Sequence, residues 1–152
     1  MLYEEKIGGS DIEPLNMKDY PHEVANVIKE ILRESVESVC PPSLYDEFLS
    51  ITVERNSEEV ERAELIKIVM EKLPISRIHI FAYVIFFMKT VVLFCEMNKM
   101  GEQNIAMMFA PNMFRHPKYT ALSEISLLGI KNDLLRIMMK YTSIIFGQKL
   151  VS

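Results

Sequence analysis

One long apolar run constrains the fold of this chain more than any other feature. Residues 78–95 carry three polar side chains, His79, Lys89 and Thr90. A membrane-spanning helix needs about 20 mostly apolar residues, and a central lysine costs roughly 2.5–3.5 kcal/mol. The run is slightly short for a span and contains such a charge. We therefore predict no transmembrane segment here, but a helix that is apolar nearly all round and is buried at the centre of a bundle.

Amphipathic helices are predicted on both sides of this run. After an irregular lead-in over residues 1–18, a helix begins near Asp19–Pro21, and its apolar positions recur at i, i+3, i+4, i+7 and i+8. These positions are Val24, Val27, Ile28, Ile31 and Leu32. At about 100° per residue their stripe centres near Val24, Ile28 and Ile31, so Lys29 and Arg33 are expected to point nearly opposite, towards solvent or a partner.

The remaining helices are placed by turn signals and by the same periodicity. Pro41-Pro42, Leu73-Pro74 and the stretch 98–101 each interrupt the pattern. Pro111 is expected to stop a short helix over 102–110. The other expected helices cover residues 43–49, 58–70 and 130–146, with Val60, Ala63, Leu65, Ile66, Val69 and Met70 on the buried side of the second. The fold class is all-α: a single-domain helical bundle over residues 1–152.

Composition excludes several classes of function. The net charge of −4 argues against nucleic-acid binding, which usually shows a basic face or tail. Cys40 and Cys95 form no C-x-x-C pair and the three histidines are scattered, so structural thiols are favoured over metal ligands, and no metal or cofactor is expected. The N-terminus lacks the features of a signal peptide, which indicates a cytoplasmic protein.

The motifs of common catalytic sites are also missing from the sequence. There is no G-x-x-x-x-G-K-[ST] phosphate loop, no G-x-S-x-G elbow and no H-E-x-x-H zinc motif. Paired carboxylates such as Glu58-Glu59 lie in charged runs that are typical of a solvated surface. We therefore predict a protein with no catalytic site of its own.

Residues 98–112 read N-K-M-G-E-Q-N-I-A-M-M-F-A-P-N. This stretch resembles the pattern N-K-M-x-x-x-N-[LI]-A-x-x-F-x-P-N of the Rho GTPase-activating (RhoGAP) domain. Three earlier blocks resemble the same family in the same order. They are His22-Glu23-Val24-Ala25 continuing into Lys29-Glu30-Ile31-Leu32-Arg33-Glu34, then Leu44-Tyr45-Asp46-Glu47-Phe48, then Leu73-Pro74. The resemblance covers residues 19–146 and implies the RhoGAP type of helical bundle.

The resemblance also implies a binding face. In the family, the residues matching Lys29 and Arg33 lie at the interface with a small GTPase, and the residue matching Asn112 lies in the pocket that faces the GTPase. By themselves, Lys29 and Arg33 also fit a pair of solvated surface cations. Asn104 is a further candidate, although an asparagine there also fits a bond to a neighbouring loop. Residues 98–100 are expected to be structural, with Met100 buried.

Two departures from the family pattern bear on function. The arginine finger loop, G-[IVL]-[FY]-R-x-S-G, has no match, and only 28 residues precede Lys29. Either the chain is a truncated piece of an active domain, which the well-kept remainder favours, or the natural protein lacks the finger. The family's L-P-x-P after Arg33-Glu34 is replaced by Ser35-Val36-Glu37-Ser38, which is expected to loosen the turn and to alter how Lys29 and Arg33 are presented.

Three functions are consistent with these observations. The leading one is a GTPase-activating or regulatory module that binds the GTP form of a Rho/Rac/Cdc42-like GTPase in signal transduction. The second is a non-catalytic GTPase-binding or scaffold domain on the same fold. The third is an unrelated all-α protein that uses residues 78–95 as a membrane or partner helix. Loss of the first helices of the domain would expose apolar surface, so a homo-oligomer that covers it is also expected.

Overall fold

The computed structural model describes residues 21–35, 37–53 and 57–151, and these residues form helices without any strand. The all-α prediction is therefore confirmed for the described part of the chain. The helices are α1 (Pro21–Glu34), α2 (Pro42–Val53), α3 (Glu59–Met70), α4 (Ile75–Leu93), α5 (Cys95–Asn98), α6 (Glu102–Met113), α7 (Ala121–Ser126), α8 (Leu128–Lys140) and α9 (Thr142–Val151).

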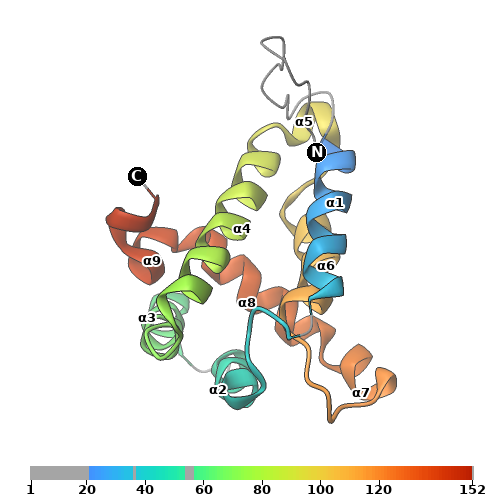
Figure 1. The fold of residues 1–152 in the computed structure, drawn as a ribbon. Coiled ribbons are helices and arrows are strands. Elements are labelled where there is room, and N and C mark those ends of the chain that lie inside the picture. Colours follow the sequence, from blue (N-terminus) through green and yellow to red (C-terminus); the bar gives the residue numbers. More distant parts are fainter. Residues whose placement is uncertain (1–20, 36, 54–56, 152) are drawn as a thin grey trace, which may run out of the picture.

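Helix α8 lies at the centre of the arrangement and packs against α2, α3, α4 and α6 (Figure 1). Helix α1 lies beside α6, and the two run in the same direction, whereas α4 and α9 lie on the other side of α8. The core at the base of the bundle is aromatic. The rings of Phe48, Phe81 and Phe114 have centroids 5.8–6.0 Å apart, and all three side chains are fully buried. Their large apolar surfaces hold α2, α4 and the end of α6 together.

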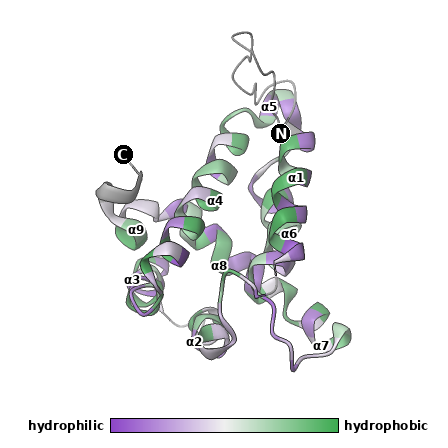
Figure 2. Cartoon of the chain, viewed as in Figure 1, coloured by the Kyte–Doolittle hydropathy of each residue, from purple (hydrophilic) through white to green (hydrophobic). Residues whose placement is uncertain are grey.

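Helix α4 is less buried than the sequence predicts. One side, with Phe81, Ile85 and Met88, lies in the core, but Tyr83 and Leu93 are 79% and 80% exposed. In Figure 2 this helix is apolar over most of its length, yet one of its faces is exposed. The prediction of a central, fully surrounded helix is therefore wrong, because the described helices pack on one side of α4 only. By length and composition α4 would suffice to cross a membrane, a test that core helices also pass.

Three other helix predictions are corrected by the structure. Pro111 does not stop α6, which continues to Met113, because a proline removes one donor while later backbone bonds such as Phe114 N–H to Ala110 O still form. The helix predicted over 130–146 is broken at Tyr141, which has non-helical backbone angles. On α3, Val60 and Leu65 are exposed rather than buried.

The buried face of α1 is rotated from its predicted position. Ala25 and Leu32 are buried, while Val27 and Ile31 are 59% and 64% exposed. The stripe is therefore centred towards Ala25, because that side faces α6. As a result Lys29 is half-buried beside the packed face instead of pointing away from it.

The turn before α6 agrees with the sequence analysis. Met100 is buried, and Asn98 is structural, since its Nδ2 donates to Val91 O at 2.9 Å and its Oδ1 accepts from Met100 N–H at 2.7 Å. Lys99 adopts a left-handed conformation with φ of 64° at the end of α5. His22, at the start of α1, lies 3.0 Å from Asn98 O through Nε2 and so connects α1 to this turn.

Candidate functional site

The four predicted site residues lie on two neighbouring helices. Lys29 and Arg33 occupy the second half of α1, and Asn104 and Asn112 lie in the first and last turns of α6. Because α1 packs along α6 in the same direction, Arg33 and Asn112 both lie near the ends where the two helices finish (Figure 1). Asn104 is about 12 Å away from Asn112 along the helix axis, at 1.5 Å per residue. The structure thus places all four on one pair of helices, with Asn104 furthest from the rest.

The two cations differ in their surroundings. Arg33 is exposed, and its Nη2 lies 2.7 Å from Glu30 Oε2 on the same helix. Such an exposed i,i+3 pair contributes only about 0.2–0.5 kcal/mol, so another carboxylate can replace Glu30 at small cost. Lys29 is half-buried and makes no ion pair or hydrogen bond with any residue that the structure describes. Both charges therefore remain available to a partner.

The two asparagines are also placed differently. Asn112 is 8% exposed, and its Nδ2 donates to Met108 O at 3.2 Å, one turn back in α6. This bond to a backbone carbonyl of the preceding turn orients the amide. Asn104 is exposed and forms no hydrogen bond to the described residues, so a bond to a neighbouring loop is not seen. Of the two, only Asn112 is held in one orientation.

The sequence analysis gave no role to Arg115, which lies after α6 at the P-N-x-x-R end of the family motif. Its Nη1 donates to Arg33 O at 3.2 Å, and its Nη2 donates to Leu32 O and Ser35 O, both at 3.1 Å. The last carbonyls of a helix have no partner within it, so this guanidinium group caps the C-terminus of α1. Neither periodicity nor spacing predicts a contact between residues 82 positions apart.

A second arginine holds the segment that follows α1. Arg77, at the start of α4, donates from Nη1 to Ser38 O at 2.7 Å and to Val39 O at 3.2 Å, while its Nη2 lies 2.7 Å from Glu37 Oε1. This is the segment in which the family's prolines are replaced. Side chains from α4 and from the loop after α6 bind the backbone of residues 35, 38 and 39. The looser turn expected from that replacement stays a prediction. Val36 lies outside the described residues.

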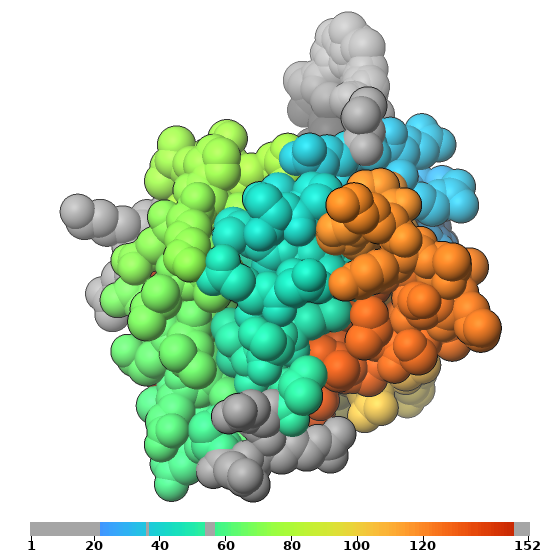
Figure 3. Space-filling view, turned by 90° about the horizontal axis from the view of Figure 1, so that it is seen from below, coloured from blue at the N-terminus to red at the C-terminus, as the bar shows by residue number. Residues whose placement is uncertain are grey.

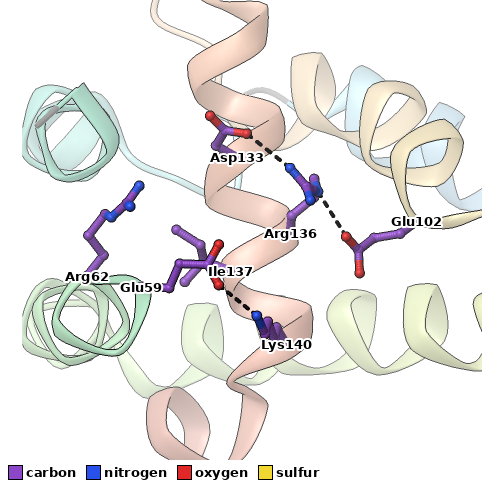
Figure 4. Close-up of a pocket in the computed structure, with 7 residues that line it drawn as sticks. All are labelled: Glu59, Arg62, Glu102, Asp133, Arg136, Ile137 and Lys140. Carbon is purple, nitrogen blue, oxygen red and sulfur yellow. Dashed lines mark hydrogen bonds and ion pairs between the residues drawn. The ribbon is translucent and has the colours of Figure 1, made fainter. Parts of the chain in front are cut away.

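A polar pocket between α3, α6 and α8 is the other concentration of charge. Its lining consists of Glu59, Arg62, Glu102, Asp133, Arg136, Ile137 and Lys140 (Figure 4). Arg136 lies 2.9 Å from Glu102 and 3.4 Å from Asp133, and Lys140 lies 2.8 Å from Glu59. The hydrogen bond from Lys140 lowers the pKa of the Glu59 carboxyl, and the bond to Glu102 raises the pKa of Arg136. These charges neutralise one another, which indicates a structural network that joins three helices.

A buried polar cluster fixes α7, a helix with no buried residue of its own. Glu124 accepts a hydrogen bond from the Tyr45 hydroxyl at 2.5 Å and lies 2.9 Å from Nζ of Lys131, which is 0% exposed. Burial, together with the bond to Glu124, raises the pKa of Tyr45 well above its usual range. Cys40 is also buried, and burial raises the pKa of its thiol to about 12, so the thiol stays protonated and unreactive.

The chain is similar to known proteins of one family. The family model described as the RhoGAP domain matches residues 4–118. The chain is similar to Rho GTPase-activating protein 24 of Mus musculus, with 38% identity over 95 residues, and to Rho GTPase-activating protein 92B of Drosophila melanogaster, with 37% identity over 100 residues. These matches cover 62% and 66% of this chain but only 13% of each relative.

Two solved structures share the fold. The crystal structure of human Rho GTPase-activating protein 15 superposes with a TM-score of 0.73 at 24% identity, over 89% of this chain and 64% of that one. The BH domain of the GTPase regulator associated with focal adhesion kinase gives 0.68 at 17% identity, over 80% of this chain and 63% of that one. The helical bundle predicted from the sequence is therefore that of the RhoGAP domain.

Proposed function

The chain belongs to the RhoGAP domain family, and from this membership we propose that it is a cytoplasmic regulatory module that binds the GTP form of a Rho/Rac/Cdc42-like GTPase through α1 and α6. The observation that carries the proposal is the placement of Lys29 and Arg33 on the helix that packs beside the family motif, with neither cation committed to a strong partner. A surface with available cations suits the acidic and phosphate-rich surroundings of a bound nucleotide.

We further propose that this chain binds the GTPase without accelerating hydrolysis, because it lacks the G-x-[FY]-R finger motif. The five arginines that the structure describes are Arg33, Arg62, Arg77, Arg115 and Arg136, and each binds a carbonyl or carboxylate of the chain itself. Arg55 and the Ile7-Gly8-Gly9-Ser10 segment, which faintly resembles the end of the finger loop, lie outside the described residues. The alternative is that a finger from sequence beyond this chain completes an active domain.

Binding and hydrolysis measurements separate these possibilities. The chain is mixed with Rho-, Rac- and Cdc42-type GTPases carrying a non-hydrolysable GTP analogue or GDP, and we expect tighter binding to the GTP form of at least one. Lys29→Ala with Arg33→Ala is expected to weaken that binding at least about tenfold, which corresponds to 1.4 kcal/mol. The matched control, Lys67→Ala with Lys72→Ala, removes the same charge from the α3 region and is expected to bind normally.

Single-turnover hydrolysis then tests the absence of a finger. An arginine finger accelerates hydrolysis about 10³–10⁵-fold, so a chain without one is expected to leave the rate close to that of the GTPase alone. Acceleration within the finger range would refute the non-catalytic proposal. Equal binding of the GTP and GDP forms, or none by the wild-type chain, would refute the GTPase-binding proposal.

A second proposal, favoured by the exposed side of α4, is self-association. Tyr83, Phe86 and Leu93 form an apolar stripe on the exposed side of α4. It lies beside a groove of about 500 Å³ whose lining includes Lys89 and Glu102. In a two-fold symmetric dimer the same surface of each copy meets its counterpart. The apolar stripes can then pack together, and the lysine of one copy can face the glutamate of the other. Sedimentation is expected to show a dimer that Leu93→Glu dissociates. A wild-type monomer at high concentration would contradict this.

A further inference from the structure

We propose that Arg115 is a positioning residue for the GTPase-binding face: it fixes the last turn of α1 to the end of α6 and so sets the place from which Arg33 reaches the partner. This inference rests on the proposed function. The segments involved lie side by side on the face seen in Figure 3, where the chain after α1 borders the segment that follows α6. Arg115 belongs to the second of these segments and binds the first.

The geometry of Arg115 is that of a cap rather than of a surface ion pair. One guanidinium group donates to three carbonyls, those of Leu32, Arg33 and Ser35, at 3.1–3.2 Å. A planar fork with several fixed N–H directions can bridge such a set, whereas the single ammonium group of a lysine cannot match its geometry. Since one acceptor is the carbonyl of Arg33 itself, the backbone from which the Arg33 side chain extends is held directly.

The segment after α1 in turn donates hydrogen bonds to the end of α6 and to the loop that follows it. Cys40 N–H donates to Met113 O at 3.2 Å, and the Ser38 hydroxyl donates to Arg115 O at 3.3 Å. The segment after α1 thus caps α6, while the residue after α6 caps α1. Movement of either end breaks hydrogen bonds at both, so Arg33 and Asn112 are kept in a fixed relation.

Arg115 binds the backbone next to a stretch that lacks the prolines of the family pattern. The L-P-x-P pattern that would stiffen the chain after Arg33-Glu34 is absent here. Arg77 and Arg115 bind different parts of this stretch. Arg77 binds residues 37–39, beyond the end of α1, and Arg115 binds residues 32, 33 and 35 at the end of α1. Only the second of these contacts includes the backbone of a proposed binding residue.

Arg115→Gln is the test, with Arg77→Gln as the matched control. A Rho-type GTPase that the wild-type chain binds is loaded with a non-hydrolysable GTP analogue. We expect Arg115→Gln to weaken binding about tenfold, as small displacements of positioned groups do, and Arg77→Gln to change it less than about twofold. In a chain that already carries Arg33→Ala, Arg115→Gln is expected to cause no further loss, because it acts through Arg33.

Hydrogen exchange provides a readout that needs no GTPase. Backbone amides of residues 31–34 are expected to exchange faster in Arg115→Gln than in Arg77→Gln. Additive losses in the double variant would mean that Arg115 touches the partner itself, and equal losses for the two arginines would mean general destabilisation; either result overturns the proposal. If the wild-type chain binds no GTPase, the proposed function fails, and unchanged exchange at 31–34 would still refute the positioning role.

Discussion

Lys131 on one side, and Lys29 with Arg33 on the other, differ in burial and in how firmly their charges are paired. Lys131, on α8, is fully buried, with its ammonium group 2.9 Å from Glu124 and 5.2 Å from the centre of the Tyr45 ring. Lys29 and Arg33, on α1, lie at or near the surface, and only Arg33 has an ion-pair partner, an exposed glutamate of the same helix. Lys131 is enclosed by its partners, whereas Lys29 and Arg33 can pair with carboxylates of another protein.

The difference shows how burial separates structural charge from charge available for binding. A buried cation must keep its partner, since an unpaired charge in the interior costs several kcal/mol. A surface cation loses little when its neighbour is exchanged, because water screens both states. We therefore expect variants of the Lys131 cluster to change stability, and variants of the α1 face to change binding.

The largest effect is expected from Glu124→Ala, which leaves Lys131 buried without its carboxylate. Breaking a buried pair from one side costs about 3–5 kcal/mol in the free energy of unfolding, measured by urea denaturation. Adding Lys131→Met to this variant is expected to restore part of the loss, because the unpaired charge is removed. A loss below about 1 kcal/mol for Glu124→Ala would show that the cluster is not structural.

The second-largest effect is expected from alkaline pH, which destabilises the buried interior. Burial raises the pKa of Cys40 from 9.0 to about 12, so its contribution to stability is complete below pH 9 and is lost as the pH rises towards 12, at up to roughly 1.4 kcal/mol per pH unit. The opposing Arg77 and Lys131 charges reduce the shift. Urea titrations between pH 8 and 11 are expected to show a flatter decline for Cys40→Ala; parallel curves would contradict the assignment.

On the α1 face, Lys29→Met is expected to separate binding from stability. The free energy of unfolding should change by less than about 0.5 kcal/mol, because Lys29 has no described ion-pair partner. Affinity for the GTP-loaded GTPase should fall about tenfold. Calorimetry and thermal unfolding on one preparation measure both. Loss of stability with retained affinity would show that Lys29 has a structural role like that of Lys131 and does not bind the GTPase.

The smallest effect is expected from Glu30→Gln, which releases Arg33. The lost i,i+3 pair costs about 0.2–0.5 kcal/mol in helix stability. The freed guanidinium should improve GTPase affinity about twofold, since no intramolecular pair then competes with the partner. Isothermal titration at low salt measures the gain. Weaker binding would instead mean that Glu30 holds Arg33 in the orientation that binding requires.

Several features of the fold could be predicted because they are local. Helical periodicity, turn signals and one long apolar run located α1 to α4. The N-K-M to P-N motif indicated the family that the match over residues 4–118 bears out. Placement of Asn98 and Met100 was also predictable, since a short turn forms its own hydrogen bonds. The four proposed binding residues lie where these helices place them, although their contact with a GTPase remains a prediction.

The sequence by itself therefore determined the helical class, the family and the helices that carry Lys29, Arg33, Asn104 and Asn112. Only the tertiary structure decided which sides of α1 and α4 are buried, because burial depends on which helices pack against each face and periodicity does not give that rotation. It also decided that Arg115 caps α1. A helix end is satisfied by whatever group the fold brings to it, and here that group comes from a residue 82 positions away.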